Sequence, residues 1–159
     1  MTEKKFKIIH TAIFWSGILL TLLVLFTCFK VVIIPSTSMV PTYKVGDVLL
    51  TNKDKDVERG DVVIFYNTID GERSIYIKRC IGVAGDTIGV HNGIVWRNGQ
   101  ALDEPYLNEP YINGEFEDIT VPEGMMFVMG DNRNVSYDSR YFGCVPVSDV
   151  IGKPILKFG

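Results

Sequence analysis

An uninterrupted apolar stretch near the N-terminus constrains this chain more than any other feature. Residues 11–29 carry no formally charged side chain and are rich in Ile, Leu, Val and Phe. As an α-helix this stretch would extend about 28 Å, which is close to the hydrocarbon thickness of a lipid bilayer. The sequence therefore predicts a single transmembrane helix over 11–29 that anchors the chain in a membrane.

Basic residues around this stretch predict its orientation. Lys4, Lys5 and Lys7 precede it, whereas Lys30 alone follows it closely. Positively charged flanks remain on the cytoplasmic side of a membrane. We therefore expect residues 1–10 to be cytoplasmic and the rest of the chain to be extracytoplasmic, in a single-pass protein of the cell membrane.

A cleavable secretory signal peptide is the main alternative for this segment, because it also has a basic start and an apolar run. The apolar part of a signal peptide is usually about 7–15 residues long, and residues 11–29 exceed that length. The end of the stretch, residues 25–30, lacks a small-x-small pattern. A lipid-modified Cys28 is a second alternative, but the bulky Phe26 fits it poorly. A retained anchor is the favoured interpretation.

The remaining residues, 30–159, are enough for one domain with a core of its own. The net charge of −3 and the lack of a clustered basic face argue against nucleic acid as a partner. With three cysteines, no CxxC motif and two histidines, the sequence predicts neither a metal site nor a cofactor. Cys80 and Cys144 could pair, but three scattered cysteines do not form a disulfide framework.

The segments after Pro35 predict β-structure throughout. They are rich in Val, Ile, Tyr and Phe and are separated by Gly, Asn and Asp, including turn sequences at 91–93 and 98–99. We expect a mostly β fold, an antiparallel and barrel-like sheet following the single N-terminal helix, with no second soluble domain. The candidate strands are 47–51, 61–66, 74–83, 87–90, 93–97, 125–129 and 150–157.

Histidine-based hydrolysis is difficult to derive from this sequence. His10 lies at the edge of the apolar stretch and His91 lies in a turn, so a Ser-His-Asp triad would depend on His91. A lysine can replace histidine as the base, but only when it is neutral. Burial in an apolar setting lowers the pKa of a lysine from about 10.4 and so favours the neutral form.

Lys78 and Ser38 are the candidates for such a pair. Lys78 lies in an apolar strand and shares a face with Tyr76 and Cys80. An edge lysine pointing into water is an equally good interpretation of this pattern alone. Ser38 lies in a short polar loop bracketed by Pro35 and Pro41, which favours a fixed shape over a flexible linker.

Five blocks of the sequence carry a resemblance to a known family. Ser38 lies in S-T-S-M-V-P-T, which resembles the S-x-S-M-x-P-T segment of type I signal peptidases, membrane-bound serine proteases. The other blocks follow in the family's order and with sensible spacing, so the resemblance covers nearly the whole chain. They are residues 44–49, 59–65, 76–86 and 130–143.

The resemblance implies a role for each matching residue. Ser38 would be the nucleophile and Lys78 the general base. The Ser38 backbone N–H and the Ser36 hydroxyl would hold the oxyanion, and Ser136 would orient the Lys78 amine. A supporting ion pair is expected between two further residues, Asp138 and Arg140.

The family also implies the substrates, which are secretory preproteins cut after small-x-small sites. A preprotein would bind as an added β-strand with small side chains at the first and third positions before the cut. The positions that match the walls of those shallow pockets are Ile34, Pro35, Met39, Tyr76 and Ile77.

Two departures and two competing interpretations remain. Asn134-Val135 stands where the family more often has Asp-Asn, and Phe142 where it often has Trp, which puts local geometry and rate in question.

A self-cleaving repressor would share a Ser-Lys dyad but is cytosolic and linked to DNA. A membrane-tethered β-domain that binds peptides would need neither Ser38 nor Lys78.

Overall fold

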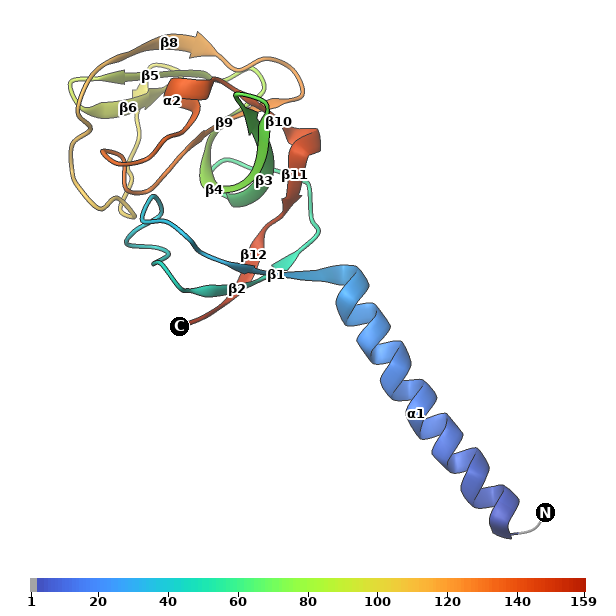
Figure 1. Ribbon diagram of the computed structural model, residues 1–159. Helices are drawn as coiled ribbons and strands as arrows, with labels where there is room; N and C mark the ends of the chain where they lie inside the picture. The colour runs from blue at the N-terminus through green and yellow to red at the C-terminus, as the bar shows by residue number, and fades with distance from the viewer. Residues whose placement is uncertain (1–2) are drawn as a thin grey trace. The chain divides into compact units, whose positions relative to one another are not determined.

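The structure, a computed structural model, describes residues 3–159, apart from the side chains of residues 4–6, 8 and 24–26. It divides into two compact units, one ending at Lys30 and the other comprising Val31–Gly159 (Figure 1).

The first unit is a single helix, α1 (Glu3–Cys28). It contains no proline, and hydroxyl groups within it donate to carbonyls one turn earlier, as Ser16 does to Ile13 at 2.8 Å and Thr27 to Leu23 at 2.8 Å. Such bonds to carbonyls of the preceding turn let a hydroxyl lie in an apolar helix. The helix begins before the predicted span 11–29 and ends one residue before Phe29.

Within the described part of residues 3–159, no helix is both long and apolar enough to cross a membrane. The predicted anchor includes residues 24–26, whose side chains lie outside the described part, as do those of Lys4 and Lys5 and the whole of residues 1–2. The anchor and its orientation stay predictions.

The second unit consists of three antiparallel sheets. Their strand orders are β1-β2-β12, β10-β9-β4-β3-β11 and β7-β6-β5-β8. A short helix, α2 (Ser139–Phe142), and a 3-10 turn at Val147–Asp149 complete it. The strands are β1 (Phe29–Ile33), β2 (Val48–Asn52), β3 (Val62–Ile69), β4 (Glu72–Val83), β5 (Thr87–His91), β6 (Ile94–Arg97), β7 (Gln100–Ala101), β8 (Phe116–Thr120), β9 (Met125–Met129), β10 (Val145–Pro146), β11 (Val150–Gly152) and β12 (Pro154–Phe158).

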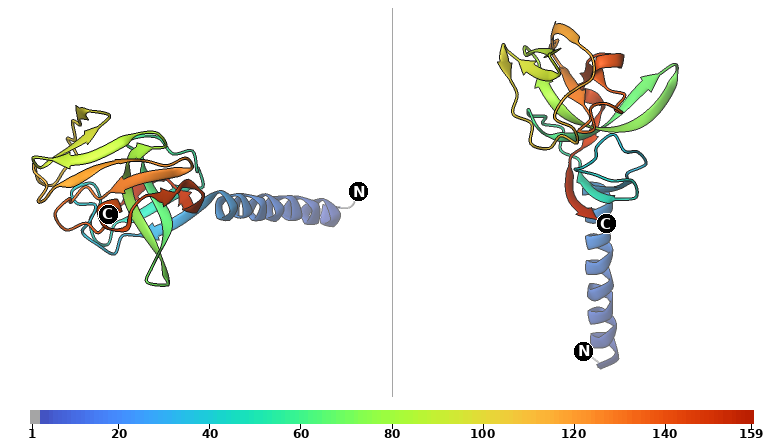
Figure 2. Two further views of the ribbon diagram at one scale, coloured as in Figure 1. Left: turned by 90° about the horizontal axis from the view of Figure 1, so that it is seen from above. Right: turned by 90° about the vertical axis from the view of Figure 1, so that its left-hand side faces the viewer.

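The long strand β4 changes its partner part-way along. Residues 72–79 pair with β3, and residues 79–83 pair with β9 on the other side. Figure 2 shows the β3–β4 hairpin, in green, projecting from the rest of the sheets. In the part of the chain that the structure describes, residues 72–78 therefore pair on one side only, and their second edge is free of any strand.

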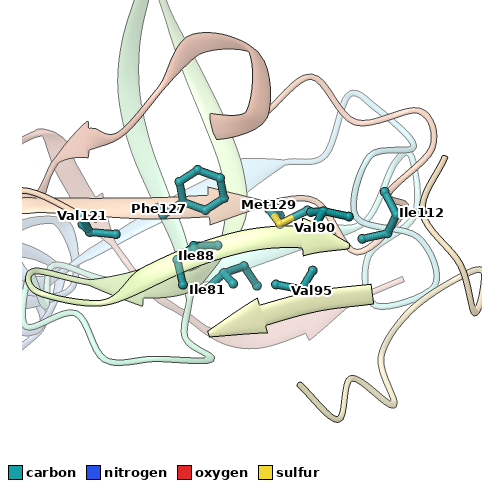
Figure 3. Close-up of a cluster of buried hydrophobic side chains, with 8 residues drawn as sticks. All are labelled: Ile81, Ile88, Val90, Val95, Ile112, Val121, Phe127 and Met129. Carbon is teal, nitrogen blue, oxygen red and sulfur yellow. The ribbon is translucent and has the colours of Figure 1, made fainter. Parts of the chain in front are cut away.

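The core is divided into three clusters of buried side chains. The one drawn in Figure 3 joins β5 and β6 to β4 and β9, with Ile88, Val95 and Phe127 all fully buried. A second lies on the β3, β4 and β9 sheet around Phe65 and Val128. The third contains Ile34, Met39, Leu49, Ile64, Ile77 and Ile151, so it attaches the loop before β2 to β3 and β4.

The structure confirms a mostly β, antiparallel fold, with strands overlapping every predicted one. The barrel-like character is confirmed in part, since the described strands form curled antiparallel sheets, but there are three of these sheets and not one (Figure 1). The predicted strand 150–157 is two strands in two sheets, β11 beside β3 and β12 beside β2. The backbone of Asn52 approaches Gly152 too closely for a Cβ atom, which marks the crossing point.

Four of the described strands lie where none was predicted, namely β1, the two-residue strands β7 and β10, and β8. β1 covers the end of the predicted anchor, and β8 escaped prediction because Glu117 and Asp118 interrupt its apolar alternation. Both predicted Asn-Gly turns have positive φ at each residue, 53° and 76° at 92–93 and 52° and 75° at 98–99, which suits tight hairpins. The Cys80 and Cys144 thiols are free.

Candidate active site

Ser38 lies in a folded loop between β1 and β2. The side chains of Ile34 and Met39 are buried in the third core cluster and fix both halves of the loop. Backbone bonds close it internally, from Val40 N to Thr37 O at 3.1 Å and from Tyr43 N to Met39 O at 2.8 Å. The predicted rigid loop is therefore present, and its shape rests on buried apolar side chains as well as on prolines.

Ser38 meets Lys78 from β4. Lys78 Nζ donates to Ser38 Oγ at 2.6 Å, and Ser36 Oγ lies 3.2 Å from the same oxygen. Ser38 is 8% exposed and Lys78 is 4% exposed. A neutral amine at this distance can accept the proton of the hydroxyl, which is what general-base activation of a serine requires.

Burial favours the neutral form of Lys78. Desolvation lowers the pKa of its amine to about 8, against the opposing attraction of the Asp138 and Asp131 carboxylates, while Arg140 lowers it further. An ordinary lysine has a pKa of 10.5. The site thus raises the fraction of neutral amine near physiological pH by roughly two orders of magnitude.

The loop between β9 and α2 holds the Ser38 loop from the other side. Asn132 N donates to Ser38 O at 3.0 Å, and Asn132 Nδ2 donates to Thr37 O at 3.2 Å. A Cβ atom on Gly130 would lie 2.4 Å from Ser38 O and 2.4 Å from Ser136 Oγ. Only glycine fits at this contact, because both neighbours are held by the surrounding structure.

Asp131 links three segments beside the site. Its carboxylate accepts two bonds from Arg79, Nε to Oδ1 at 2.8 Å and a second to Oδ2 at 2.6 Å, and a further bond from the Thr42 hydroxyl. The Arg79 guanidinium also stacks 3.8 Å from the Tyr106 ring centre. Asp131 is fully buried and the Arg79 side chain is 12% exposed, so this pair is shielded from water.

Asp138 and Arg140 form an ion pair, and the charges of both residues affect the pKa of Lys78. Arg140 Nε donates to Asp138 Oδ1 at 2.8 Å, and Asp138 Oδ2 accepts from Gly130 N at 3.1 Å. Asp138 also caps the start of α2. The pair therefore fixes the β9–α2 loop, and any further effect on the reaction stays a prediction.

Ser136 is buried, and its hydroxyl has no hydrogen-bond partner among the described residues. The expected bond to the Lys78 amine is thus absent from this state of the protein. The hydroxyl lies beside Gly130, at the same contact that holds Ser38 O. Its orienting role stays a prediction.

A groove of about 360 Å³ runs past Ser38 along the free edge of β4. Of the predicted substrate-binding residues, Pro35, Tyr76 and Ile77 line it. Ile34 and Met39 are 1% and 0% exposed and pack with Ile77, so they support the groove from within the core. The full lining is Pro35, Ser36, Ser38, Ser74, Ile75, Tyr76, Ile77, Lys78, Val135 and Tyr137.

The sequence analysis did not identify Ser74 and Ile75 as lining residues of this groove. It also did not predict the ion pair between Arg79 and Asp131. Ser74 and Ile75 could have been found from the predicted strand, since they continue the edge that Lys78 occupies. Arg79 and Asp131 are 52 positions apart, and no local pattern connects them. His91 is bonded to Asp118 at 2.7 Å on another sheet, so His91 does not pair with Ser38.

Among the residues that the structure describes, no group of three His, Cys, Asp or Glu side chains is arranged to hold a metal ion.

Comparison with known proteins places the whole chain in one family. A family model described as "Signal peptidase, peptidase S26" matches residues 7–158. The chain belongs to the signal peptidase family. The resemblance inferred from the five sequence blocks is thereby confirmed, and with it the prediction of a peptidase.

The named relatives of this chain are signal peptidases as well. The chain is 36% identical to the signal peptidase I of Bacillus caldolyticus, covering 79% of this chain and 77% of the relative. It is 35% identical to signal peptidase IB of Staphylococcus aureus, with 89% and 86% covered. Against a probable signal peptidase I-2 of Synechocystis the identity is 40%, and the match spans 79% of this chain but 61% of that relative's length.

A solved structure resembles the fold as well. The crystal structure of a signal peptidase I from Enterococcus faecalis V583 aligns with a TM-score of 0.51 and 36% identity. The alignment covers 62% of this chain and 96% of that one. The fold of the aligned part of the chain is therefore shared with another member of the family.

Proposed function

We propose that this signal peptidase removes N-terminal signal peptides from exported preproteins, cutting after small-x-small sites with Ser38 as nucleophile and neutral Lys78 as general base. The observation that carries the proposal is the 2.6 Å contact between a buried lysine and a serine hydroxyl. A buried lysine without a paired carboxylate is costly to keep charged, and the chemistry makes use of its neutral form.

The reaction follows from the positions of these groups. Neutral Lys78 takes the hydroxyl proton as Ser38 Oγ attacks the scissile carbonyl, and the oxyanion is held by the Ser38 N–H and the Ser36 hydroxyl. Lys78 then gives the proton to the leaving amine, which leaves an acyl ester on Ser38. Water attacks that ester with Lys78 again accepting a proton, and the free serine is restored.

The free edge of β4 supports binding of the preprotein as an added strand. Within this edge, residues 74–78 line the groove that also contains Ser38. Main-chain hydrogen bonds from such an edge provide affinity that does not depend on sequence, and shallow pockets select side chains. Ile77, 6% exposed, leaves little depth beside Lys78 and suits a small residue such as alanine.

A lipid bilayer is the second proposed partner. Signal peptidases I are in general membrane-associated, and exposed apolar side chains gather on two strands of the β1-β2-β12 sheet. Together with a retained anchor over 11–29, they support a site that works beside the outer membrane surface, with the N-terminus cytoplasmic. These side chains, here termed the apolar strip, are Val31, Ile33, Leu156 and Phe158.

Cleavage of a preprotein with an Ala-x-Ala site by the full-length protein in detergent tests the proposal, with product sequencing to locate the cut. Ser38→Ala should abolish cleavage while its thermal unfolding stays close to that of the wild type. Tyr111→Ser, an exposed change outside the groove, is the matched control and should cut normally. Equal cleavage by Ser38→Ala would exclude Ser38 as the nucleophile, and a folded but inactive wild type would favour a peptide-binding domain.

A further inference from the structure

The groove continues beyond the small pockets into a wider apolar region. Its lining there consists of Ile75 and Ser74 from β4 and of Val135 and Tyr137 from the β9–α2 loop. Ile75 is 53% exposed, Val135 61% and Tyr137 48%. We term Ile75, Val135 and Tyr137 the outer groove.

The backbone of β4 explains why the groove opens in this direction. Lys78 and Ile77 are buried, Tyr76 is half-buried, and residues 72–75 are exposed, so the strand emerges from the core toward its hairpin end. Ile75 shares a face with Ile77, since side chains alternate along a strand. The surface beside Ile75 is therefore apolar like the pocket at Ile77, and Ile75 is 53% exposed against 6% for Ile77, which leaves room for a larger side chain.

Aromatic contacts hold the opposite wall in place. The Tyr137 ring stacks on Tyr141 at 5.3 Å and meets Phe142 edge-on at 5.6 Å. Phe142 in turn contacts the Tyr76 ring at 6.0 Å, so the two walls of the groove are joined through one ring. An apolar surface fixed in this way is ready to bind without losing much side-chain freedom.

We propose that the outer groove is a specificity subsite for a bulky apolar side chain at the fifth position before the cut. This rests on the proposed function, in which the scissile residue at the first position lies at Ser38 and the small residue at the third position lies beside Ile77. In an extended peptide the first, third and fifth side chains point the same way, and each pair of residues advances about 6.6 Å. The fifth side chain then reaches Ile75, which is two residues beyond Ile77.

The chemistry of the lining favours an apolar occupant. Lys78, at the inner end, is the only formally charged side chain among the groove residues described. Val135 also occupies a position where the family pattern more often has Asn, so this chain has an apolar side chain on that wall. A charged residue at the fifth position would lose water there without gaining a partner.

The test compares peptides with Ala at the first and third positions and Leu, Ser or Asp at the fifth. For each enzyme we measure the ratio of kcat/KM for the Leu peptide to that for the Ser peptide. Burying about half of a leucine side chain predicts a ratio of about 10 for the wild type, with Asp no better than Ser. Ile75→Ser and Val135→Ser should each reduce the ratio to about 3 or less, because each removes part of the apolar contact.

Tyr111→Ser is the matched control, since Tyr111 is 64% exposed and lies outside this groove. It should keep the wild-type ratio, which shows that a loss in the groove variants does not come from removing just any exposed apolar side chain. A wild-type ratio near 1, or a high ratio that survives both groove variants, overturns the subsite while cleavage itself still supports the proposed function. If the wild type cuts none of these peptides or the preprotein, the proposed function falls and the subsite falls with it.

Discussion

At the scale of single residues, the defining feature is a lysine kept where a positive charge is unfavourable. Lys78 is 4% exposed and its amine contacts a hydroxyl, with the carboxylates of Asp131 and Asp138 acting only through space. Burial lowers its pKa to about 8. A group whose pKa falls on folding destabilises the protein wherever it is still protonated in the unfolded chain.

Replacing Lys78 with Met should therefore stabilise the fold at neutral pH. At pH 7 the charge is present in both states, and the pKa difference between 10.5 and about 8 corresponds to about 3 kcal/mol. The stability gain should shrink as pH rises from 8 toward 10.5, because the folded chain then holds Lys78 neutral and no longer buries a charge, and releasing the proton costs less as pH approaches the unfolded pKa of 10.5. Urea unfolding at pH 7 and pH 10 measures this, and a gain that is equal at both pH values would contradict it.

Ser136 allows a separate test of orientation. Its hydroxyl is buried and unpartnered among the described residues, so Ser136→Ala should leave the unfolding free energy unchanged or raise it by about 1 kcal/mol. If the hydroxyl aligns the Lys78 amine during the reaction, kcat should fall by about tenfold with KM unchanged. A variant with normal kcat would restrict Ser136 to packing against Gly130.

At the scale of elements, the site depends on how two loops are joined across the sheet. The Ser38 loop contributes Thr42, the β9–α2 loop contributes Asp131, and β4 contributes Arg79, and all three meet at one buried carboxylate. Removing one member of a buried ion pair leaves the other charge without compensation.

Asp131→Asn should therefore lower stability by about 3 kcal/mol, which for a chain of this size corresponds to a Tm lower by about 10 °C. Cleavage should fall as well, because the adjacent Asn132 holds Ser38 O. The control is Asp149→Asn, whose partner Arg73 is 3.9 Å away and 60% exposed, and its Tm should change by about 1 °C at most. An equal change in Tm for both variants would contradict this prediction, because the buried Asp131–Arg79 pair would then stabilise the fold no more than an exposed pair.

Some elements of the fold could be predicted from sequence patterns and others could not, for identifiable physical reasons. Strand β4 and its lysine were predictable because apolar alternation and bounding turns are local signals. Strand β8 was missed because Glu117 and Asp118 face outward and break the alternation. The linkage of Arg79 to Asp131 depends on which segments the sheets bring together, and charge patterns along the chain do not encode that.

At the scale of the whole molecule, the chain combines a helix of apolar sequence with a β domain that exposes its own apolar strip. In the strip, Val31 is 66% exposed, Ile33 64%, Leu156 54% and Phe158 56%. Apolar side chains gathered on one surface are typical of sites that contact a membrane or a partner protein.

The proposed bilayer contact predicts that Leu156→Ser combined with Phe158→Ser lowers preprotein cleavage in lipid vesicles by about fivefold, from the loss of two partly buried apolar side chains. Cleavage of a short soluble peptide should change far less, because the strip does not line the groove. Tyr111→Ser again provides an exposed control. Equal losses on vesicles and on the peptide would indicate damage to the fold and would contradict a lipid-facing role.

The pH dependence of kcat/KM on a soluble peptide tests the central claim most directly. If neutral Lys78 activates Ser38, kcat/KM should rise tenfold per pH unit below an inflection near pH 8 and level off above it, and Lys78→Met should be inactive throughout. A profile that is flat between pH 6 and 9, an inflection near the histidine value of about 6.5, or an active Lys78→Met enzyme would contradict the account.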